Sequence, residues 1–451
     1  MRKKIIKTTE RLTISQIIVL FYFFAAIIST ILLTLPITLK DGVELSFIDA
    51  LFTAISAISV TGLSTINLSE TLSVPGTFIF AFILQFGGIG VMALGTFFWL
   101  LVGKKIGFRE RRLIMIDQNA TSLSGVVDTV KNILIAFIVI ELIGTILLGI
   151  HFINYFPTWQ EAFLQGFFAS VSAATNAGYD ITGKSLLPFA TDYYVQLINI
   201  TLLVLGAIGY PVLIEVRNYF RHKGDLKYRF SLFTKVTTLT YFLLVVIGTA
   251  FIYLFEKKNF FADKSWHESF FYSLFQSVST RNGGLATMDV SDFSTPTLLL
   301  ICLLMFIGAS PSSVGGGIRT TTFAIVILSI FSYAQGKNTI KVFKKEVDIE
   351  DVFKSYIVIT TATIICGISV ILLSFIEPRF TLMEILFEVT SAFGTSGFSM
   401  GITANLSTFG KIIIMILMFI GRVGIISFLF IIRGTPKKES IHYPKERIII
   451  G

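Results

Sequence analysis

The chain has 451 residues, of which 53% are hydrophobic and only 14% are charged, and its mean hydropathy is +0.79. This composition excludes a water-soluble globular protein and predicts a membrane protein with several spans. The net charge of +9 does not indicate a nucleic-acid partner, because 27 of the 37 Lys and Arg residues fall in five segments at every second junction between apolar runs. Such clusters mark the cytoplasmic side, so we expect both termini there. The segments are 1–12, 103–131, 217–235, 337–354 and 433–447.

The N-terminus resembles the first two regions of a signal peptide, since basic residues at 2–4 precede an apolar run at 14–35. No small-residue cleavage site follows, and the run is long enough to cross a membrane. We therefore expect a first helix that is retained in the mature protein.

Long and short apolar runs then alternate in a pattern that occurs four times. At a rise of about 1.5 Å per residue, about 20 residues cross the hydrocarbon core, so the long runs predict eight full crossings. The first long run of each unit covers 14–35, 133–156, 232–255 or 352–375, and the second covers 77–102, 195–216, 297–331 or 411–432. Two crossings return the chain to its starting side, which predicts parallel repeats about an axis normal to the membrane. The predicted units are 1–109, 110–222, 223–337 and 338–433, followed by a cytoplasmic tail at 434–451.

Between the two long runs lies a shorter amphipathic run, as at 47–58 and 381–393. About 12 residues are too few to cross, so these runs predict half-helices that enter from outside and turn back. The C-terminal end of such a helix carries about half a negative charge. Four of these ends on one axis would favour a cation.

A loop with a central glycine follows each short run. The glycines are Gly62, Gly178, Gly284 and Gly397, at intervals of 178−62 = 116, 284−178 = 106 and 397−284 = 113 residues. Each follows a small residue, precedes a bulky apolar one and has a phenylalanine or leucine ten positions earlier, so the chain contains four copies of one unit. In chain order, the small residues before the glycines are Thr61, Ala177, Gly283 and Ser396. The bulky residues after them are Leu63, Tyr179, Leu285 and Phe398. The residues ten positions earlier are Phe52, Phe168, Leu274 and Phe387. Glycine permits backbone conformations in which carbonyl oxygens line a path, and carbonyl rings select cations by replacing their hydration water.

The second long run of the third unit is interrupted at residues 308–322. A proline, four glycines and several hydroxyl residues will not hold a regular helix. Irregular backbone at membrane depth is tolerated where it is buried in protein or lines water, so we expect this stretch to face the central path as a mobile gate. A plain helix kink is the alternative. The candidate gate residues are Gly308, Ser310, Pro311, Ser312, Ser313, Gly315, Gly316 and Gly317.

The other second runs carry Gly87, Gly206 and Gly421 at a depth that matches Gly308. Arg422 therefore lies at mid-membrane, where a charge is costly unless it faces water or a partner. Two roles stay open for it: an anchor bonded to carbonyl groups, or a barrier to permeation. Arg281, next to the third loop, is expected to hold that loop in place and not to contact the ion.

The four loops, the interruption at 308–322 and the sequence at 421–424 together resemble the Trk/Ktr/HKT superfamily of potassium transporters. With no extra helices before the first unit, the chain is most similar to the bacterial KtrB type of membrane subunit, which includes KtrD. The resemblance implies an all-α membrane fold with four helix, pore-loop, helix repeats around a pseudo-fourfold pore. It also implies potassium uptake across a bacterial plasma membrane, with 308–322 as the gate, Arg422 facing it, and Gly62 favouring potassium over sodium.

By the same resemblance, twelve residues form a selectivity filter that binds potassium through backbone carbonyls alone. They are Val60, Thr61, Gly62, Asn176, Ala177, Gly178, Asn282, Gly283, Gly284, Thr395, Ser396 and Gly397. The third loop departs from the family, in which threonine and alanine more often precede the glycine. Asn282 and Gly283 stand there instead.

The resemblance further implies a homodimer in the lipid membrane, seated on an octameric cytoplasmic RCK subunit of the KtrA or KtrC type that binds nucleotide, with sodium as a candidate activator. No nucleotide motif is found in the chain. The regulator is therefore expected on a separate polypeptide, and no organic cofactor in this one. The apolar end at 447–451 is expected to dock at the subunit interface.

Two other functions are weaker alternatives. Substrate-coupled alternating access usually goes with inverted repeats, which are missing here. An intramembrane hydrolase would use Ser310 or Ser312 as nucleophile, but no histidine lies in the middle of a span and we expect no base within the spans. The histidines are His151, His222, His267 and His442.

Overall fold

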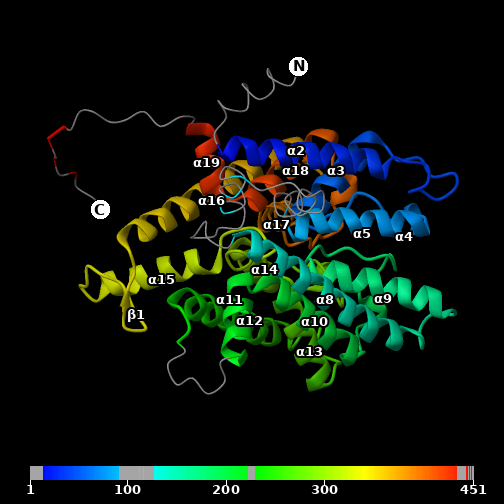
Figure 1. The fold of residues 1–451 in the computed structure, drawn as a ribbon, viewed down its shortest axis with the longest axis horizontal. Helices are drawn as coiled ribbons and strands as arrows, with labels where there is room; N and C mark the ends of the chain where they lie inside the picture. The colour runs from blue at the N-terminus through cyan, green and yellow to red at the C-terminus, as the bar shows by residue number, and fades with distance from the viewer. Residues whose placement is uncertain are drawn as a thin grey trace.

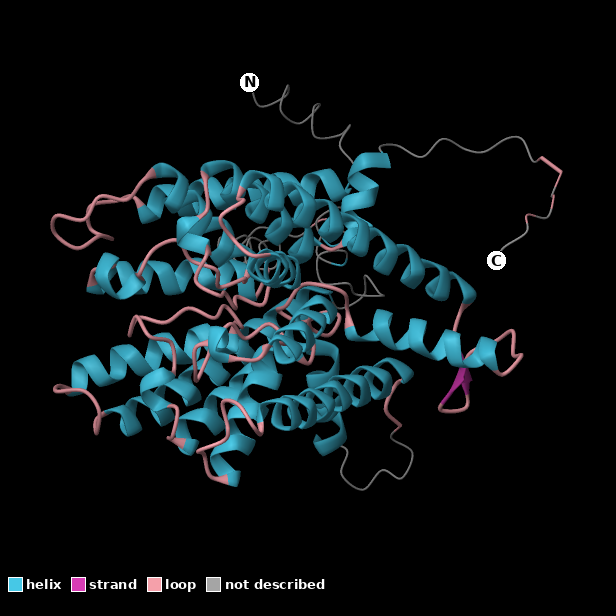
Figure 2. Cartoon of the chain, turned by 180° about the vertical axis from the view of Figure 1, so that it is seen from behind, coloured by secondary structure: helices cyan, strands magenta, loops and turns pink. Residues whose placement is uncertain are grey.

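The computed structural model describes residues 14–90, 126–221 and 229–433, together with positions 107, 111, 115, 443, 444, 446 and 448. Within these ranges the protein is mostly helical, with one short hairpin formed by β1 (Lys341–Val342) and β2 (Lys345–Glu346) (Figures 1 and 2). Several predictions fall outside the described residues. They concern the basic segment 1–12, residues 91–102 of the long run 77–102, most of 103–125, the two histidines at 222 and 442, and most of the tail.

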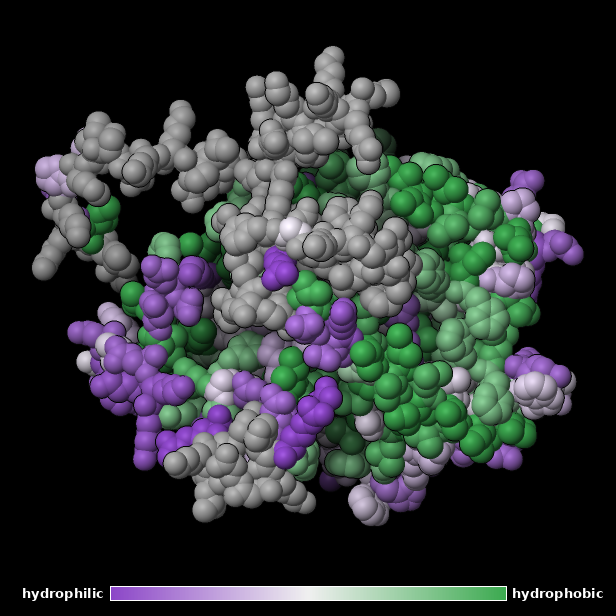
Figure 3. All heavy atoms as spheres, viewed as in Figure 1, coloured by the Kyte–Doolittle hydropathy of each residue, from purple (hydrophilic) through white to green (hydrophobic). Residues whose placement is uncertain are grey.

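The first long runs form four long helices. They are α2 (Ile14–Leu33), α8 (Val126–Phe152), α12 (Leu232–Glu256) and α16 (Ile349–Ile376). The second of these begins seven residues before the predicted 133, and the other three agree with the prediction to within three residues. In the described part of the chain, these four are long and apolar enough to cross a membrane by themselves. Large apolar side chains stay exposed on their outer faces, such as Phe23 of α2 and Val246 of α12. Hydrophobic residues cover most of the right half of the face drawn in Figure 3, as lipid contact requires.

The four predicted half-helices are present as helices of 13 to 16 residues: α3 (Phe47–Ser59), α9 (Trp159–Ala174), α13 (Trp266–Ser279) and α17 (Leu382–Gly394). Each begins with a hydroxyl N-cap that accepts a hydrogen bond from the backbone N–H of an acidic residue three positions later. The pairs are Ser46 and Asp49, Thr158 and Glu161, Ser265 and Glu268, and Thr381 and Glu384. This arrangement satisfies orphan N–H groups and places negative charge at the positive end of the helix.

The second long runs differ from the prediction, because none of them is a continuous helix in the described residues. They form α5 (Val74–Gly88), α10 (Tyr193–Ala207), α14 (Thr295–Ile307) and α18 (Thr408–Val423). Just beyond each helix the chain turns at a glycine with positive φ: Gly90 at 95°, Gly209 at 96°, Gly308 at 59° and Gly424 at 87°. Helical residues have negative φ, so these glycines end the helices. Eight continuous crossings are therefore not confirmed.

After the breaks, three shorter helices continue the chain. They are α11 (Tyr210–Arg221), which is bent by 103° from α10, α15 (Thr320–Ala334) and α19 (Ile425–Arg433). Since α15 begins at Thr320, the irregular stretch covers 308–319 and is slightly shorter than predicted. We call residues 308–319 the interrupting loop. The remaining short elements are α4 (Leu68–Thr71), η1 (Leu187–Phe189), η2 (Val290–Asp292) and η3 (Thr403–Asn405).

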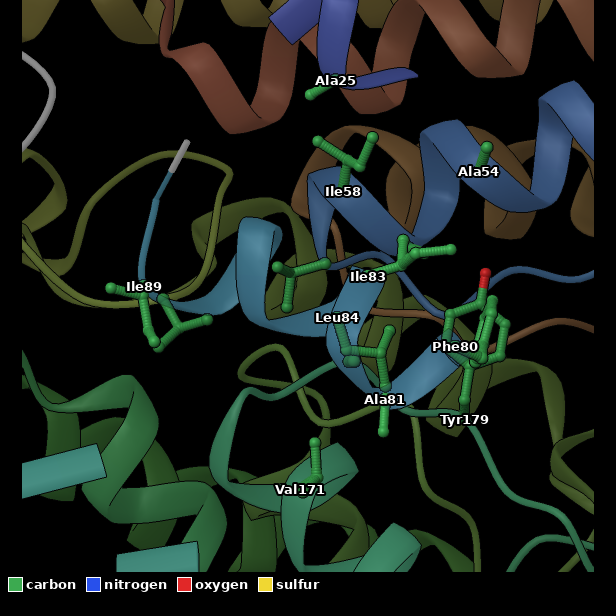
Figure 4. Close-up of a cluster of buried hydrophobic side chains, with 14 of the residues drawn as sticks. Ala25, Ala54, Ile58, Phe80, Ala81, Ile83, Leu84, Ile89, Val171 and Tyr179 are labelled. Carbon is green, nitrogen blue, oxygen red and sulfur yellow. The ribbon is translucent and has the colours of Figure 1, made fainter. Parts of the chain in front are cut away.

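The helices pack in a closed cycle. Each half-helix contacts the second helix of the unit before it, in the pairs α9 with α5, α13 with α10, α17 with α14 and α3 with α18. The bulky residue after each loop glycine is buried in the core between the same two units. Figure 4 shows this for Tyr179, which lies beside Phe80 of α5 in a cluster that includes Ile58 and Val171. The corresponding residues Leu63, Leu285 and Phe398 lie in three separate clusters. This packing brings the four loops to the centre.

Candidate functional site

The four loop glycines lie against one another in a ring that follows the order of the chain. A Cβ added to Gly62 would lie 3.3 Å from the Cα of Gly178, and one added to Gly178 would lie 2.7 Å from the Cα of Gly284. A Cβ added to Gly284 would lie 3.4 Å from the Cα of Gly397, and one added to Gly397 would lie 3.1 Å from the Cα of Gly62. All four glycines have φ between 64° and 91°. Any side chain at these positions would therefore meet both crowding and backbone strain.

One carbonyl oxygen from each loop alternates with the glycines. A Cβ on Gly62 would lie 2.5 Å from the oxygen of Ala177, and a Cβ on Gly178 would lie 3.0 Å from that of Gly283. The oxygen of Ser396 approaches Gly284 in the same way, and the oxygen of Thr61 approaches Gly397. We call these four glycines and four oxygens the carbonyl ring. Carbonyl oxygens carry partial negative charge and can replace the water around a cation.

Three of the loops share one way of ending a half-helix. Val60, Asn176 and Thr395 have φ of 57°, 54° and 49° and end their helices in the left-handed conformation. The N–H of the next residue then donates to a serine carbonyl five positions back, which is the Schellman arrangement. These bonds run from Thr61 to Ser56, Ala177 to Ser172 and Ser396 to Ser391, at 2.8–2.9 Å. A positive φ is strained for a branched residue such as Val60, so the packing around the loop must hold it.

The third loop is built differently. Asn282 has a φ of 104°, and the N–H of Gly283 donates to the carbonyl of Ser279, only four positions back, at 2.5 Å. The third loop therefore differs from the other three loops in its backbone geometry as well as in its sequence.

Contacts behind the ring join neighbouring loops. The hydroxyl of Tyr179 donates to the carbonyl of Leu63 at 3.1 Å. The aromatic ring of Tyr179 packs edge-on against that of Phe80, with 4.9 Å between the ring centroids (Figure 4). The hydroxyl of Ser396 donates to the carbonyl of Thr280 at 3.3 Å. Tyr179, the bulky residue after Gly178, therefore anchors the second loop to the first.

The interrupting loop is bonded to the second helices of two other units. The N–H groups of Ser310 and Val314 donate to Ala207 and Gly206 of α10 at 3.1 and 3.2 Å. The N–H of Gly317 donates to Gly421 of α18 at 3.2 Å. A kink within one helix would not make these contacts with two other units.

Arginines hold several carbonyl groups of the interrupting loop. Arg422 donates to the carbonyls of Val314 and Gly87, so its geometry is that of an anchor bonded to carbonyls. Arg281 is buried and donates to the carbonyl of Gly308 at 3.2 Å, on the side of the interrupting loop. Arg319, which the sequence reasoning missed, donates to the carbonyl of Gly315. The sequence could have indicated Arg319, because it is a basic residue inside the predicted interruption at 308–322.

A cavity borders the interrupting loop. Its lining includes Ser312, Ser313 and Val314 of the loop, together with Arg319 and Arg422. The loop therefore has open space beside residues 312–314.

Comparison with known proteins bears on what this site does. The family model for TrkH, described as a cation transport protein, matches residues 6–443. The chain belongs to the TrkH family of cation transport proteins. It is 52% identical to Ktr system potassium uptake protein D of Bacillus subtilis (strain 168) over the full length of both chains. It is 33% identical to Ktr system potassium uptake protein B of the same organism, covering 100% of this chain and 99% of that protein.

The crystal structure of the potassium transporter TrkH from Vibrio parahaemolyticus has the same fold. Its TM-score is 0.71 at 20% identity, covering 92% of this chain and 84% of that one. The family is one of transport proteins, so the alternative of an intramembrane hydrolase with Ser310 or Ser312 as nucleophile is set aside.

A carboxylate within a span is costly and marks a functional candidate, and the sequence reasoning overlooked one. Glu141 of α8 is buried, and Gln85 of α5 donates to its two carboxylate oxygens at 2.7 and 2.8 Å. The expectation that no base lies in a span was therefore wrong. A single acidic residue within the apolar run 133–156 was the signal.

Proposed function

We propose that the protein takes up potassium ions across a bacterial plasma membrane through the carbonyl ring. The observation that carries this proposal is the convergence of four carbonyl oxygens, those of Thr61, Ala177, Gly283 and Ser396, on four glycines in one closed ring. The Bacillus subtilis relative with 52% identity is a potassium uptake protein, which agrees with the proposal. The twelve loop residues predicted from the sequence then form the selectivity filter.

The driving force requires no chemical step. An ion sheds its water into the ring, where the C-terminal ends of α3, α9, α13 and α17 add partial negative charge. An inside-negative potential supplies about 2.3 kcal/mol per charge for each 100 mV, which is enough for passive uptake. Gly62 has no side chain to narrow the ring or offer a hydroxyl, which favours potassium over sodium.

The four units form parallel repeats about a pseudo-fourfold axis, with boundaries at 109, 222, 337 and 433 and both termini in the cytoplasm. The recurrent pairing of each half-helix with the preceding second helix supports this arrangement. Each repeat crosses the membrane twice, and its second crossing is broken at a glycine.

The interrupting loop serves as the gate. Its contacts with α10 and α18 fix one position, and the cavity beside residues 312–314 offers space for another. Arg422 stabilises the first position through Val314 and presents a positive charge to an approaching cation.

The protein acts as a homodimer on an octameric RCK subunit of the KtrA or KtrC type that binds nucleotide, and sodium activates it. The "Ktr system" in the names of two relatives supports a multi-subunit assembly.

The test is complementation of a bacterium that lacks its own potassium uptake systems. Expression of the chain should restore growth at low potassium, and co-expression of an RCK subunit should make uptake depend on nucleotide. Immunodetection of the chain in the membrane fraction controls for expression. If the membrane-inserted protein gives no growth and no rubidium uptake with or without the RCK subunit, the proposed function is wrong.

A further inference from the structure

Asn282 stands where the third loop differs from the other three. It lies two residues before Gly284, at the place that Val60, Asn176 and Thr395 occupy in their loops. Its φ of 104° is about 50° away from theirs, and its side chain is fully buried. A buried amide needs hydrogen-bond partners, and those partners show what the side chain does.

The amide of Asn282 contacts three segments that are distant in sequence. Its Nδ2 donates to the carbonyl of Val60 in the first loop at 3.3 Å. Its Oδ1 accepts from the hydroxyl of Thr395 in the fourth loop at 2.8 Å and from the N–H of Gly316 in the interrupting loop at 3.0 Å. The N–H of Gly316 also reaches the hydroxyl of Thr395, at 2.8 Å.

Chemistry fixes the orientation of this amide. The backbone N–H of Gly316 can only donate, so it must face Oδ1, and the backbone carbonyl of Val60 can only accept, so it must face Nδ2. The first and third loops are opposite each other in the ring order, which runs Gly62, Gly178, Gly284, Gly397. The bond from Asn282 to Val60 therefore passes across the ring opening on the side of the interrupting loop.

The interrupting loop packs directly against Asn282 and Thr395. A Cβ on Gly315 would lie 2.6 Å from the Cγ of Asn282, and one on Gly316 would lie 2.6 Å from the Oγ1 of Thr395. The amide of Asn282 therefore keeps its position while the loop is in place. When Gly316 moves away, Oδ1 loses its main-chain donor.

We propose that Asn282 is a positioning residue that couples the interrupting loop to a cation site at the Val60 carbonyl, on the side of the carbonyl ring that faces this loop. This inference rests on the proposed function. With the loop in place, the Nδ2 hydrogens point at the Val60 carbonyl and put positive charge where a cation would be bound. With the loop displaced, the amide is free to turn, the Val60 carbonyl is released, and Oδ1 becomes an additional oxygen ligand.

The test measures potassium affinity from the potassium-dependent rise in thermal stability of the purified full chain, at constant ionic strength set by a large organic cation. Four proteins are compared: wild type, Asn282→Ala, a protein with residues 312–317 shortened, and the double variant. In the full-length background, Asn282→Ala should strengthen potassium binding about fivefold, at the lower end of usual coupling between sites. In the shortened background it should leave binding unchanged or weaken it, because the released amide is then a ligand.

Two further variants guard against a simple packing effect. Asn282→Leu keeps the shape and adds no charge but can neither accept from Gly316 nor donate to Val60, so it should also strengthen potassium binding in the full-length background. Thr395→Val removes a hydroxyl bonded to the same loop but leaves the bond between Asn282 and Val60, so its effect should be smaller than that of Asn282→Ala. An equal or larger effect of Thr395→Val would overturn the proposal.

The outcomes separate this inference from the proposed function. If wild type is not stabilised by potassium at all, the carbonyl ring is not a potassium site and both ideas are wrong. If wild type binds potassium and Gly62→Ser weakens that binding, but Asn282→Ala has the same effect with the long and the shortened loop, the ring stands and the coupling through Asn282 is wrong.

Discussion

The carbonyl oxygen of Thr61 lies against Gly397, and this contact joins the first loop of the chain to the last. Equivalent contacts link each of the other loops to the next, so the ring closes with no loop left out. The closure depends on packing far from the ring, because each half-helix must rest on the second helix of the preceding unit. The proposed cation site is thus a product of the whole chain.

Gly62→Ser should reduce the preference for potassium over sodium by about tenfold or more. A Cβ at this position would lie 2.5 Å from the carbonyl of Ala177, and the φ of 91° adds strain of about 1–3 kcal/mol. Rubidium and sodium uptake into proteoliposomes measures the ratio. Gly42→Ser is the matched control, because Gly42 also has a positive φ but has open space around it. Equal selectivity in wild type and Gly62→Ser would count against the ring.

Shortening residues 312–317 should raise potassium flux several-fold. The deletion removes the N–H of Val314 that is bonded to Gly206 and the N–H of Gly317 that is bonded to Gly421, so the loop can no longer hold its position. Flux is measured in proteoliposomes at matched protein density. Replacing Phe343 and Lys344, at the tip of the β hairpin, with glycine controls for changes elsewhere. A deletion that only lowers flux in a folded protein would refute the gate assignment.

Arg422→Ala should raise flux and lower thermal stability together. The substitution removes the donor to Val314 and Gly87, and leaving buried carbonyls without a partner costs about 1–3 kcal/mol. The comparison is Arg379→Ala, which removes an exposed arginine near the end of α16. If flux rises without any loss of thermal stability, the anchor role is wrong and a pure barrier role remains.

Asp192, the N-cap of α10, should make stability depend on pH in the acid range. Burial tends to raise the pKa of its carboxyl, but hydrogen bonds from Tyr155 at 2.6 Å and His151 at 2.5 Å outweigh this effect, and the pKa falls below its ordinary value. A lowered pKa gives stability that is present above the unfolded pKa, about 3.9, and is lost as pH falls through the folded value. Wild type should therefore exceed Asp192→Asn in thermal stability at pH 7, and the gap should close below about pH 4. A gap that persists at low pH would refute this.

The sequence predicted three of the four long helices, and the two half-helices whose bounds it gave, to within three residues, because their apolar runs end at clear polar boundaries; α8 begins seven residues before its predicted start. It did not predict the breaks at Gly90, Gly209 and Gly424, since apolar residues continue on both sides of each one. The repeat spacing indicated that four loops converge, but not which loops are neighbours. The reach of Asn282 to the first and fourth loops follows from that order and could not be predicted from the third loop alone.

The most direct measurement of the central claim is the position of a heavy potassium analogue in the folded protein. Crystals grown with rubidium or thallium and examined by anomalous diffraction should show a peak on the axis of the ring. It should lie about equally far from the carbonyl oxygens of Thr61, Ala177, Gly283 and Ser396, and should weaken in Gly62→Ser. Anomalous peaks found only elsewhere, with the four loops still in contact, would contradict it.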